Sequence, residues 1–105
     1  MTDVNITVDA GACRFKTFIQ ASVQDDLSVK FTVRSECPNV KNLALMLDIV
    51  DAMDVVADRI TDNVLMKKCS EFIPHPACPI PCALVKACEV ASDLAVKKDA
   101  VITFE

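Results

Sequence analysis

Apolar and polar positions alternate along the first third of the chain. Val4, Ile6 and Val8 are each followed by a polar residue, and the same alternation returns over residues 15–23 and 29–34. A period of two is typical of strands that bury one face, so three strands are expected here. Turns are expected around Gly11, the only glycine, and at residues 24–26. The three strands should therefore form an antiparallel meander.

From Cys37 onward the apolar positions repeat at a helical spacing. Cys37-Pro38-Asn39 is typical of a helix start, because proline at the first helical position loses no hydrogen bond. Helices are expected to about residue 50, over residues 52–60, from an N-cap at Thr61 through Phe72, and over residues 80–95. Residues 101–104 predict a final strand. We therefore expect one α+β domain over residues 1–105, in which helices pack on one face of a small antiparallel sheet made of the three-strand N-terminal meander plus a C-terminal strand.

Composition and charge narrow the class of protein. The chain has 105 residues, of which 52% are hydrophobic and 25% are charged, as expected for a globular domain with its own core. The formal charge is −4 and the basic residues are scattered, which argues against a nucleic-acid partner. No apolar run approaches the ~20 residues of a membrane-spanning helix, and no signal-peptide pattern begins the chain. No membrane association and a cytoplasmic location are expected.

Six cysteines are the most unusual feature of this composition. Disulfides are rare in a reducing compartment, so free thiols, metal ligands or core residues are the alternatives. If the second and third strands form a hairpin, paired residue numbers sum to about 51, and Cys13 lies opposite residue 38, beside Cys37. Cys37 and Cys78 each precede a proline and an expected helix, whose N-terminus favours a thiolate.

These thiols suggest a metal site. Zinc takes four ligands in a closed structural site, and Cys13, Cys37, Cys69 and Cys78 could supply them, with His75 as an alternate fourth ligand in place of Cys69. An iron–sulfur cluster would use the same thiolates, so zinc and a cluster both stay open. The chain lacks the paired C-x2-C knuckles of a zinc ribbon. Cys88 is expected to fill core space, whereas the role of Cys82 is left open.

Other chemistry has little support in the sequence. One histidine and one glycine exclude a Ser/His/Asp triad and a glycine-rich phosphate loop, so no catalytic residue and no organic cofactor are predicted, and a binding protein is favoured over an enzyme. A second hypothesis is metal-free thiol chemistry, with Cys78 or Cys37 as nucleophile or sulfur carrier. A third is a protein-interaction domain or homodimer, in which the cysteines only pack and an edge strand pairs with a partner.

Three segments also carry a resemblance. "GACRF", "SECPNVKNLA" and "HPACPIPCALVKACEVASDLAVKKDAVITFE" resemble a family of proteins of similar length and unassigned function from anaerobic archaea and bacteria. More loosely, the chain is similar to the TSCPD cysteine domain, which implies metal binding at the positions of Cys13, Cys37, Cys78 and Cys69. The chain departs from that domain in lacking glycines near the second cysteine and in having Ala77 in place of a serine.

Overall fold

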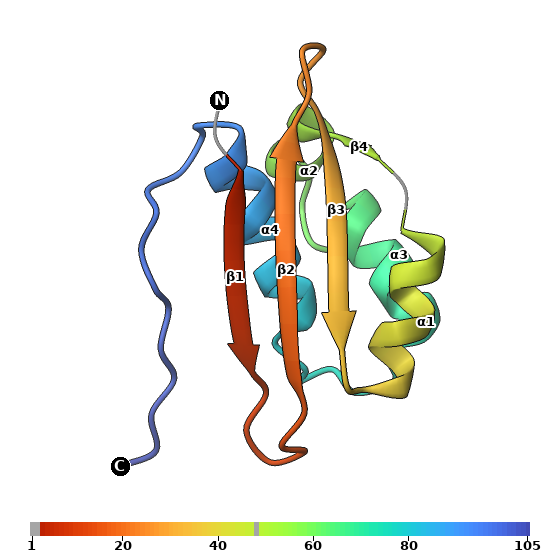
Figure 1. Cartoon of the computed structure of the whole chain (residues 1–105), viewed down its shortest axis with the longest axis vertical. Helices are drawn as coiled ribbons and strands as arrows, with labels where there is room; N and C mark the ends of the chain where they lie inside the picture. The colour runs from red at the N-terminus through yellow and green to blue at the C-terminus, as the bar shows by residue number, and fades with distance from the viewer. Residues whose placement is uncertain (1–2, 48) are drawn as a thin grey trace.

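A computed structural model describes residues 3–47 and 49–105 (Figure 1). Three strands come first, followed by helices and one short strand: β1 Val4–Asp9, β2 Lys16–Val23, β3 Ser28–Ser35, α1 Pro38–Met46, β4 Val50–Asp51, α2 Ala52–Ala57, α3 Val64–Phe72 and α4 Ile80–Ala91. The α+β class and the N-terminal meander are therefore confirmed.

The four strands form one antiparallel sheet in the order β1-β2-β3-β4. Cross-strand pairs such as Val4 with Ala21 and Ile6 with Ile19 place the apolar residues of each strand on one face. The other face carries polar side chains, as the alternation in the sequence predicts. Register follows from this pattern, because a slip of one residue would move every apolar side chain to the solvent.

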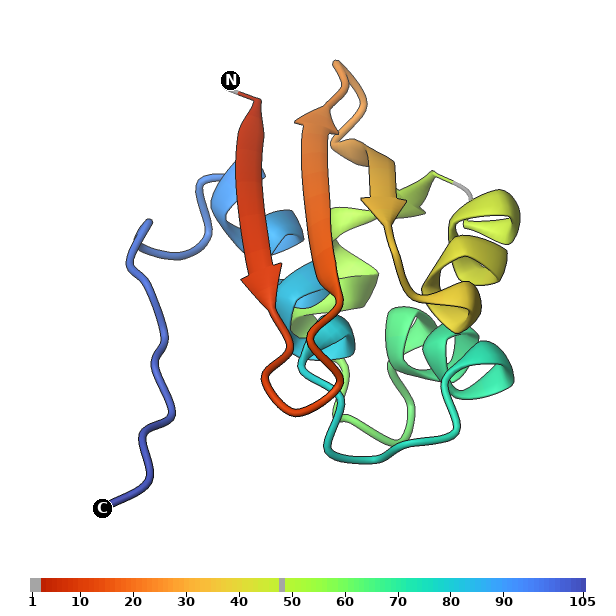
Figure 2. The same ribbon diagram turned by 60° about the horizontal axis from the view of Figure 1, so that its bottom comes forward.

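Helices cover the apolar face only (Figures 1 and 2). α4 packs on β1 and β2, α1 packs beside β3, and α2 and α3 lie against α4. Buried side chains from both layers form a single core, which includes Ile19, Val29, Leu43, Leu65 and Leu84. One polar residue on the inner face, Thr17, is satisfied by the hydroxyl of Ser35 at 2.7 Å. The opposite face of the sheet is left to solvent.

The fourth strand is not the C-terminal one that the sequence predicts. Residues 101–104 form no strand, and every residue from 93 to 105 is exposed. β4, at Val50–Asp51, pairs with the start of β3 instead, with Val50 opposite Val29. Leu27, in the β2–β3 turn, accepts a hydrogen bond from the Ala52 N–H at 3.2 Å, which holds β4 and the start of α2 against that turn. The prediction of a C-terminal strand in this sheet is therefore wrong.

Three helix boundaries also differ from expectation. α1 ends at Met46, where Leu47 turns extended, and the part of the expected helix at residue 48 lies outside the described residues. α2 stops at Ala57, well before residue 60. α4 ends at Ala91, because Asp93 adopts a left-handed conformation with φ 60° and the Ser92 hydroxyl satisfies the Cys88 carbonyl at 2.6 Å.

The N-cap of α3 is Asn63 and not Thr61. Its side-chain oxygen accepts hydrogen bonds from the N–H groups of Leu65 and Met66, at 3.0 and 3.3 Å. Its amide nitrogen donates to the Val55 carbonyl at 2.6 Å, which ties the start of α3 to α2. Asn63 is buried, whereas Thr61 is exposed, so Asn63 is the residue that forms hydrogen bonds to both α2 and α3.

Over the residues described, no helix has the length and apolar character needed to cross a membrane.

Candidate functional site

Two of the predicted metal ligands lie where the strands end. Cys13 lies in the turn between β1 and β2, and Cys37 follows β3 as the N-cap of α1. Pairing between β2 and β3 reaches Thr17 opposite Ser35, so paired numbers sum to 52, one more than the sequence predicts. The β1–β2 turn and the start of α1 therefore lie at the same end of the sheet, the lower end in Figure 1, which comes forward in Figure 2.

Hydrogen bonds fix the backbone of Cys37. The Cys37 N–H donates to the Ser35 hydroxyl at 3.1 Å, and that hydroxyl is also paired with buried Thr17. The Cys37 carbonyl accepts from the Lys41 N–H at 2.9 Å, which is the first hydrogen bond of α1. The Cys37 side chain makes no capping hydrogen bond. The backbone at Cys37 is thus held rigidly, while its thiol is left without a capping role.

Cys78 reaches the same end of the molecule from the start of α4. Its N–H donates to the His75 carbonyl at 3.1 Å, which closes a turn before the helix, and Pro79 is the N-cap of α4. The sulfur accepts a hydrogen bond from the Ile80 N–H, one of the unpaired donors of the first helical turn. This loop is seen in Figure 2 below the start of α4.

Burial raises the pKa of the Cys78 thiol above its ordinary value of 9.0. The hydrogen bond from Ile80 opposes this shift, while the nearby thiols of Cys37 and Cys13 add to it, because two thiolates repel each other. The thiolate that the sequence predicts at this helix start is therefore not favoured at Cys78. The same interactions show that Cys37 and Cys13 each lie within electrostatic range of the Cys78 thiol.

Cys69, on α3, completes the predicted set. It is buried, and burial together with the charge of Cys78 raises its pKa to about 12. Cys78 therefore interacts with all three of the other cysteines proposed as ligands, which come from the β1–β2 turn, the end of β3 and α3. All six cysteines lie in the described part of the chain, and each is a free thiol.

A cavity of about 460 Å³ opens beside Cys69 and Cys78. Its wall includes His75, Cys82 and Lys67, so two predicted ligands, the alternate ligand and one further thiol share one space. Cys82 lies in the first turn of α4, four residues after Cys78, which precedes the helix, and Cys82 is exposed. The sequence leaves the role of Cys82 open, and its spacing of four residues from Cys78 is the local signal that the two could share a site.

Cys88 belongs to the core. It is fully buried on the inner face of α4, and burial raises its pKa to about 11, opposed by a hydrogen bond from Ser92. The charges of Glu89 and Asp51 raise the pKa further. The prediction that Cys88 fills core space is confirmed.

The thiols do not stand in a closed ligand shell. Within residues 3–47 and 49–105, no three His, Cys, Asp or Glu side chains are arranged so that they could hold a metal ion as they lie. Cys13 is exposed and Cys37 and Cys78 are half-buried. The cysteines therefore approach one another around Cys78 without converging on a single point.

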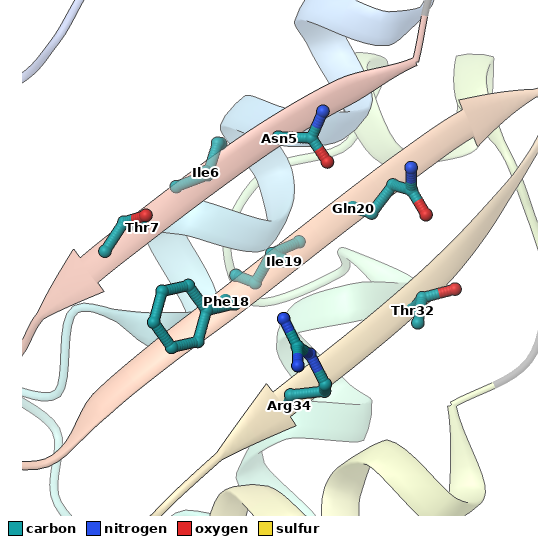
Figure 3. A pocket seen from close by; sticks show the side chains of 8 residues that line it. All are labelled: Asn5, Ile6, Thr7, Phe18, Ile19, Gln20, Thr32 and Arg34. Carbon is teal, nitrogen blue, oxygen red and sulfur yellow. The ribbon is translucent and has the colours of Figure 1, made fainter.

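A second hollow, of about 320 Å³, lies on the open face of the sheet. Figure 3 shows Asn5, Thr7, Phe18, Gln20, Thr32 and Arg34 standing on this face. The Arg34 guanidinium lies 5.5 Å from the centre of the Phe18 ring, in cation–π contact. The residues that line this hollow include no cysteine, histidine or carboxylate, so they offer neither a nucleophile nor a metal ligand.

Comparison with known proteins identifies the family. A family model described as a family of unknown function (DUF6951) matches residues 4–104, and the chain belongs to this family. The resemblance to an uncharacterised family is thereby supported, whereas the likeness to the TSCPD domain and the archaeal or bacterial origin stay predictions. No curated protein matches the chain, and no solved structure does.

Proposed function

We propose that this protein binds a thiophilic metal, as a zinc ion or an iron–sulfur cluster, through Cys13, Cys37, Cys69 and Cys78. One observation carries the proposal: burial raises the pKa of both Cys78 and Cys69, and other cysteines of the set add smaller charge effects, Cys37 and Cys13 at Cys78 and Cys78 at Cys69. Three thiols from three separate segments thus lie within electrostatic range of the fourth, Cys78.

Such a cluster is unfavourable for metal-free thiolates and favourable for a bound cation. Thiolates near one another repel, so the Cys69 and Cys78 thiols stay protonated in the metal-free protein, as their raised pKa values indicate. A divalent cation replaces those protons and compensates the negative charge. The four thiols match the all-cysteine ligand set of many structural zinc sites, and an iron–sulfur cluster uses the same number.

Metal binding has to draw the thiols inward, because no three ligands stand ready around one point in the part of the chain described. Cys13 is exposed in a turn, and the Cys37 thiol caps nothing. The backbones on either side are held by strand pairing and by α1, so the fold itself need not change.

Cys69 is a better fourth ligand than His75. Burial and, to a smaller extent, the charge of Cys78 raise the pKa of Cys69, so the two thiols lie within electrostatic range of each other, and both line the cavity of about 460 Å³. His75 lines the same cavity, but it is exposed. It contacts Cys78 only through its backbone carbonyl, which accepts a hydrogen bond from the Cys78 N–H.

Metal-free nucleophilic chemistry is less well supported. A nucleophilic cysteine is activated by a lowered pKa, whereas burial raises the pKa of Cys78. At neutral pH the Cys78 thiol is therefore protonated unless a cation displaces its proton.

Thiol alkylation mapped by mass spectrometry tests the proposal. Anaerobic, reduced protein is treated with iodoacetamide before and after removal of metal by a chelator. We expect the chelator to speed alkylation of Cys13, Cys37 and Cys78 by at least about tenfold, because bound thiolates are shielded. Cys82, exposed beside the same cavity, is the internal control and should react at the same rate in both samples. Equal rates at Cys13, Cys37 and Cys78 with and without chelator would contradict the proposal.

A further inference from the structure

The cavity of about 460 Å³ connects a buried thiol with exposed metal-binding side chains. Cys69 is only 2% exposed, yet it lines this cavity. Cys78 and Met66 on the same wall are half-buried, and Cys82 and His75 are exposed. Sulfur and imidazole groups therefore line the cavity at every level of burial, from exposed Cys82 to buried Cys69.

The cavity gives ions in solvent a route to Cys69. A metal ion that binds Cys69 has to reach a sulfur that the rest of the protein almost completely covers. Cys69 borders open space in this cavity, whereas neither Cys13 nor Cys37 lines it. An ion with six waters, at about 30 Å³ each, occupies about 180 Å³, so the cavity is large enough for a hydrated ion.

The wall of the cavity suits soft cations and does not attract positive charge in general. The residues that line it include no aspartate or glutamate, and Lys67 among them adds a positive charge. Magnesium and calcium prefer charged oxygen ligands, which these side chains do not supply. Thiol, thioether and imidazole groups, as in Cys82, Met66 and His75, suit zinc, copper and iron. Discrimination among cations therefore depends on ligand type.

We propose that this cavity is the entry route for the metal and that Cys82 is the first ligand to bind the incoming ion. This inference rests on the function proposed above, since the ion ends at Cys13, Cys37, Cys69 and Cys78. Cys82 is exposed in the first turn of α4, and Cys78 precedes that helix on the same cavity wall. An ion at Cys82 is thus in the same space as two of its final ligands.

The transfer is a ligand exchange in which no oxidation state changes. Cys82 releases its proton to solvent when its sulfur binds the ion. Cys78 then releases its proton as its own sulfur binds, the bond between Cys82 and the ion breaks, and the Cys82 thiolate takes up a proton. Within residues 3–47 and 49–105 no three His, Cys, Asp or Glu side chains are arranged to hold a metal ion, so an ion at Cys82 keeps water ligands. Those waters occupy positions that the next thiols can take.

The rate of metal uptake tests this route. The probe is the cadmium ion, whose bonds to thiolates absorb in the ultraviolet. Reduced, metal-free protein is mixed with one equivalent of cadmium by stopped flow, with and without excess magnesium, and both the rate and the final absorbance are recorded. Cys82→Ser removes the sulfur, and Cys82→His restores a metal ligand at the same position. Lys86→Ser is the control, because Lys86 is exposed on α4 and does not line the cavity.

We expect Cys82→Ser to reach the final absorbance of wild type at least about fivefold more slowly, and Cys82→His and Lys86→Ser to stay within about twofold of the wild-type rate. Excess magnesium should change none of these rates. Uptake by Cys82→Ser at the wild-type rate would overturn the entry route and leave the four-thiol site intact. A lower final absorbance in Cys82→Ser would make Cys82 a permanent ligand and would also overturn it. A wild type without thiolate–cadmium absorbance would overturn the proposed function together with this route.

Discussion

Cys69 on α3 and Cys78 ahead of α4 line one cavity, and burial together with the charge of the Cys78 thiolate raises the pKa of Cys69. Eight residues lie between them in the sequence, and the loop between α3 and α4 returns the chain so that both line the same cavity. Cys78 is in turn within electrostatic range of Cys37 and Cys13.

The Cys69→Ala and Cys88→Ala variants should differ in metal content, whereas their metal-free forms should have similar free energies of unfolding. Both are buried, and replacement of either by alanine removes one buried sulfur, which should lower the free energy of unfolding by about 1–2 kcal/mol. Cys69→Ala should also lose the bound metal, whereas Cys88→Ala should keep it. Metal analysis of the purified variants and chemical denaturation of both after removal of metal by a chelator check this, because bound metal would itself stabilise Cys88→Ala. Full metal occupancy in Cys69→Ala would remove Cys69 from the ligand set.

The metal-free protein should lose stability at alkaline pH. The pKa values of Cys69 and Cys88 are raised in the folded state from 9.0 to about 12 and about 11. Because the folded state holds these protons more tightly, their stabilising effect is complete below pH 9 and declines as the pH rises toward 11–12.

Urea midpoints of the reduced, chelator-treated protein, measured from pH 8 to about pH 11, check this dependence. The control is a variant with valine at both positions, Cys69→Val/Cys88→Val, whose midpoint should fall less over the same range. Identical pH profiles for wild type and the double variant would show that these thiols do not cause the loss. In the metal-bound protein the sensitive range should move to acid pH, where protons compete with metal for the thiolates.

Metal affinity should rise steeply with pH around neutrality. Burial and neighbouring thiols raise the pKa of Cys78 and Cys69, so each must release a proton when it binds a metal ion. The apparent affinity should increase by up to about tenfold per pH unit for each such thiol. Competition with a calibrated zinc chelator at two pH values measures the slope. A slope of zero would mean that no protonated thiol takes part in binding.

Asn63 should contribute more to stability than Thr61, although both precede α3. Asn63→Ala removes the cap at Leu65 and Met66 and leaves the Val55 carbonyl without its donor, which should cost about 2–3 kcal/mol in free energy of unfolding. Thr61 is exposed, so Thr61→Ala should change stability by less than about 0.5 kcal/mol. Equal effects in denaturation curves would contradict the assignment of the cap.

Local patterns predicted most of the sheet and the order of the helices. Alternation of apolar residues is enough to identify β1, β2 and β3, because one face of each strand is buried. The helix boundaries and β4 depend on contacts that are distant in sequence. Val50 is extended because it pairs with Val29, and Asn63 is the cap because it also reaches Val55. Neither contact is visible in the surrounding residues.

The candidate site was predictable to a similar degree. Strand pairing alone predicts that Cys13 and Cys37 lie at one end of the sheet. The position of Cys78 before a proline and an expected helix identifies it as a further candidate ligand. The raised pKa of Cys78 was not predictable, because it depends on burial by side chains from other elements. The place of Cys82 on the cavity wall likewise depends on how α4 packs against α3.

Strand propensity was misleading at residues 101–104. These residues have the composition of a strand, yet the structure of a single chain gives them no partner among the residues it describes. Propensity measures how well a residue fits a pleated, half-buried surface, and it does not say which molecule supplies that surface.

The most direct test of the metal site is the metal and acid-labile sulfide content of protein purified without air, with wild type, Cys78→Ser and Cys82→Ser prepared side by side. We expect about one zinc per chain, or iron with sulfide and visible absorption, in wild type and in Cys82→Ser, and loss of most of the metal in Cys78→Ser. Metal far below one equivalent in wild type, or equal content in Cys78→Ser, would contradict the account.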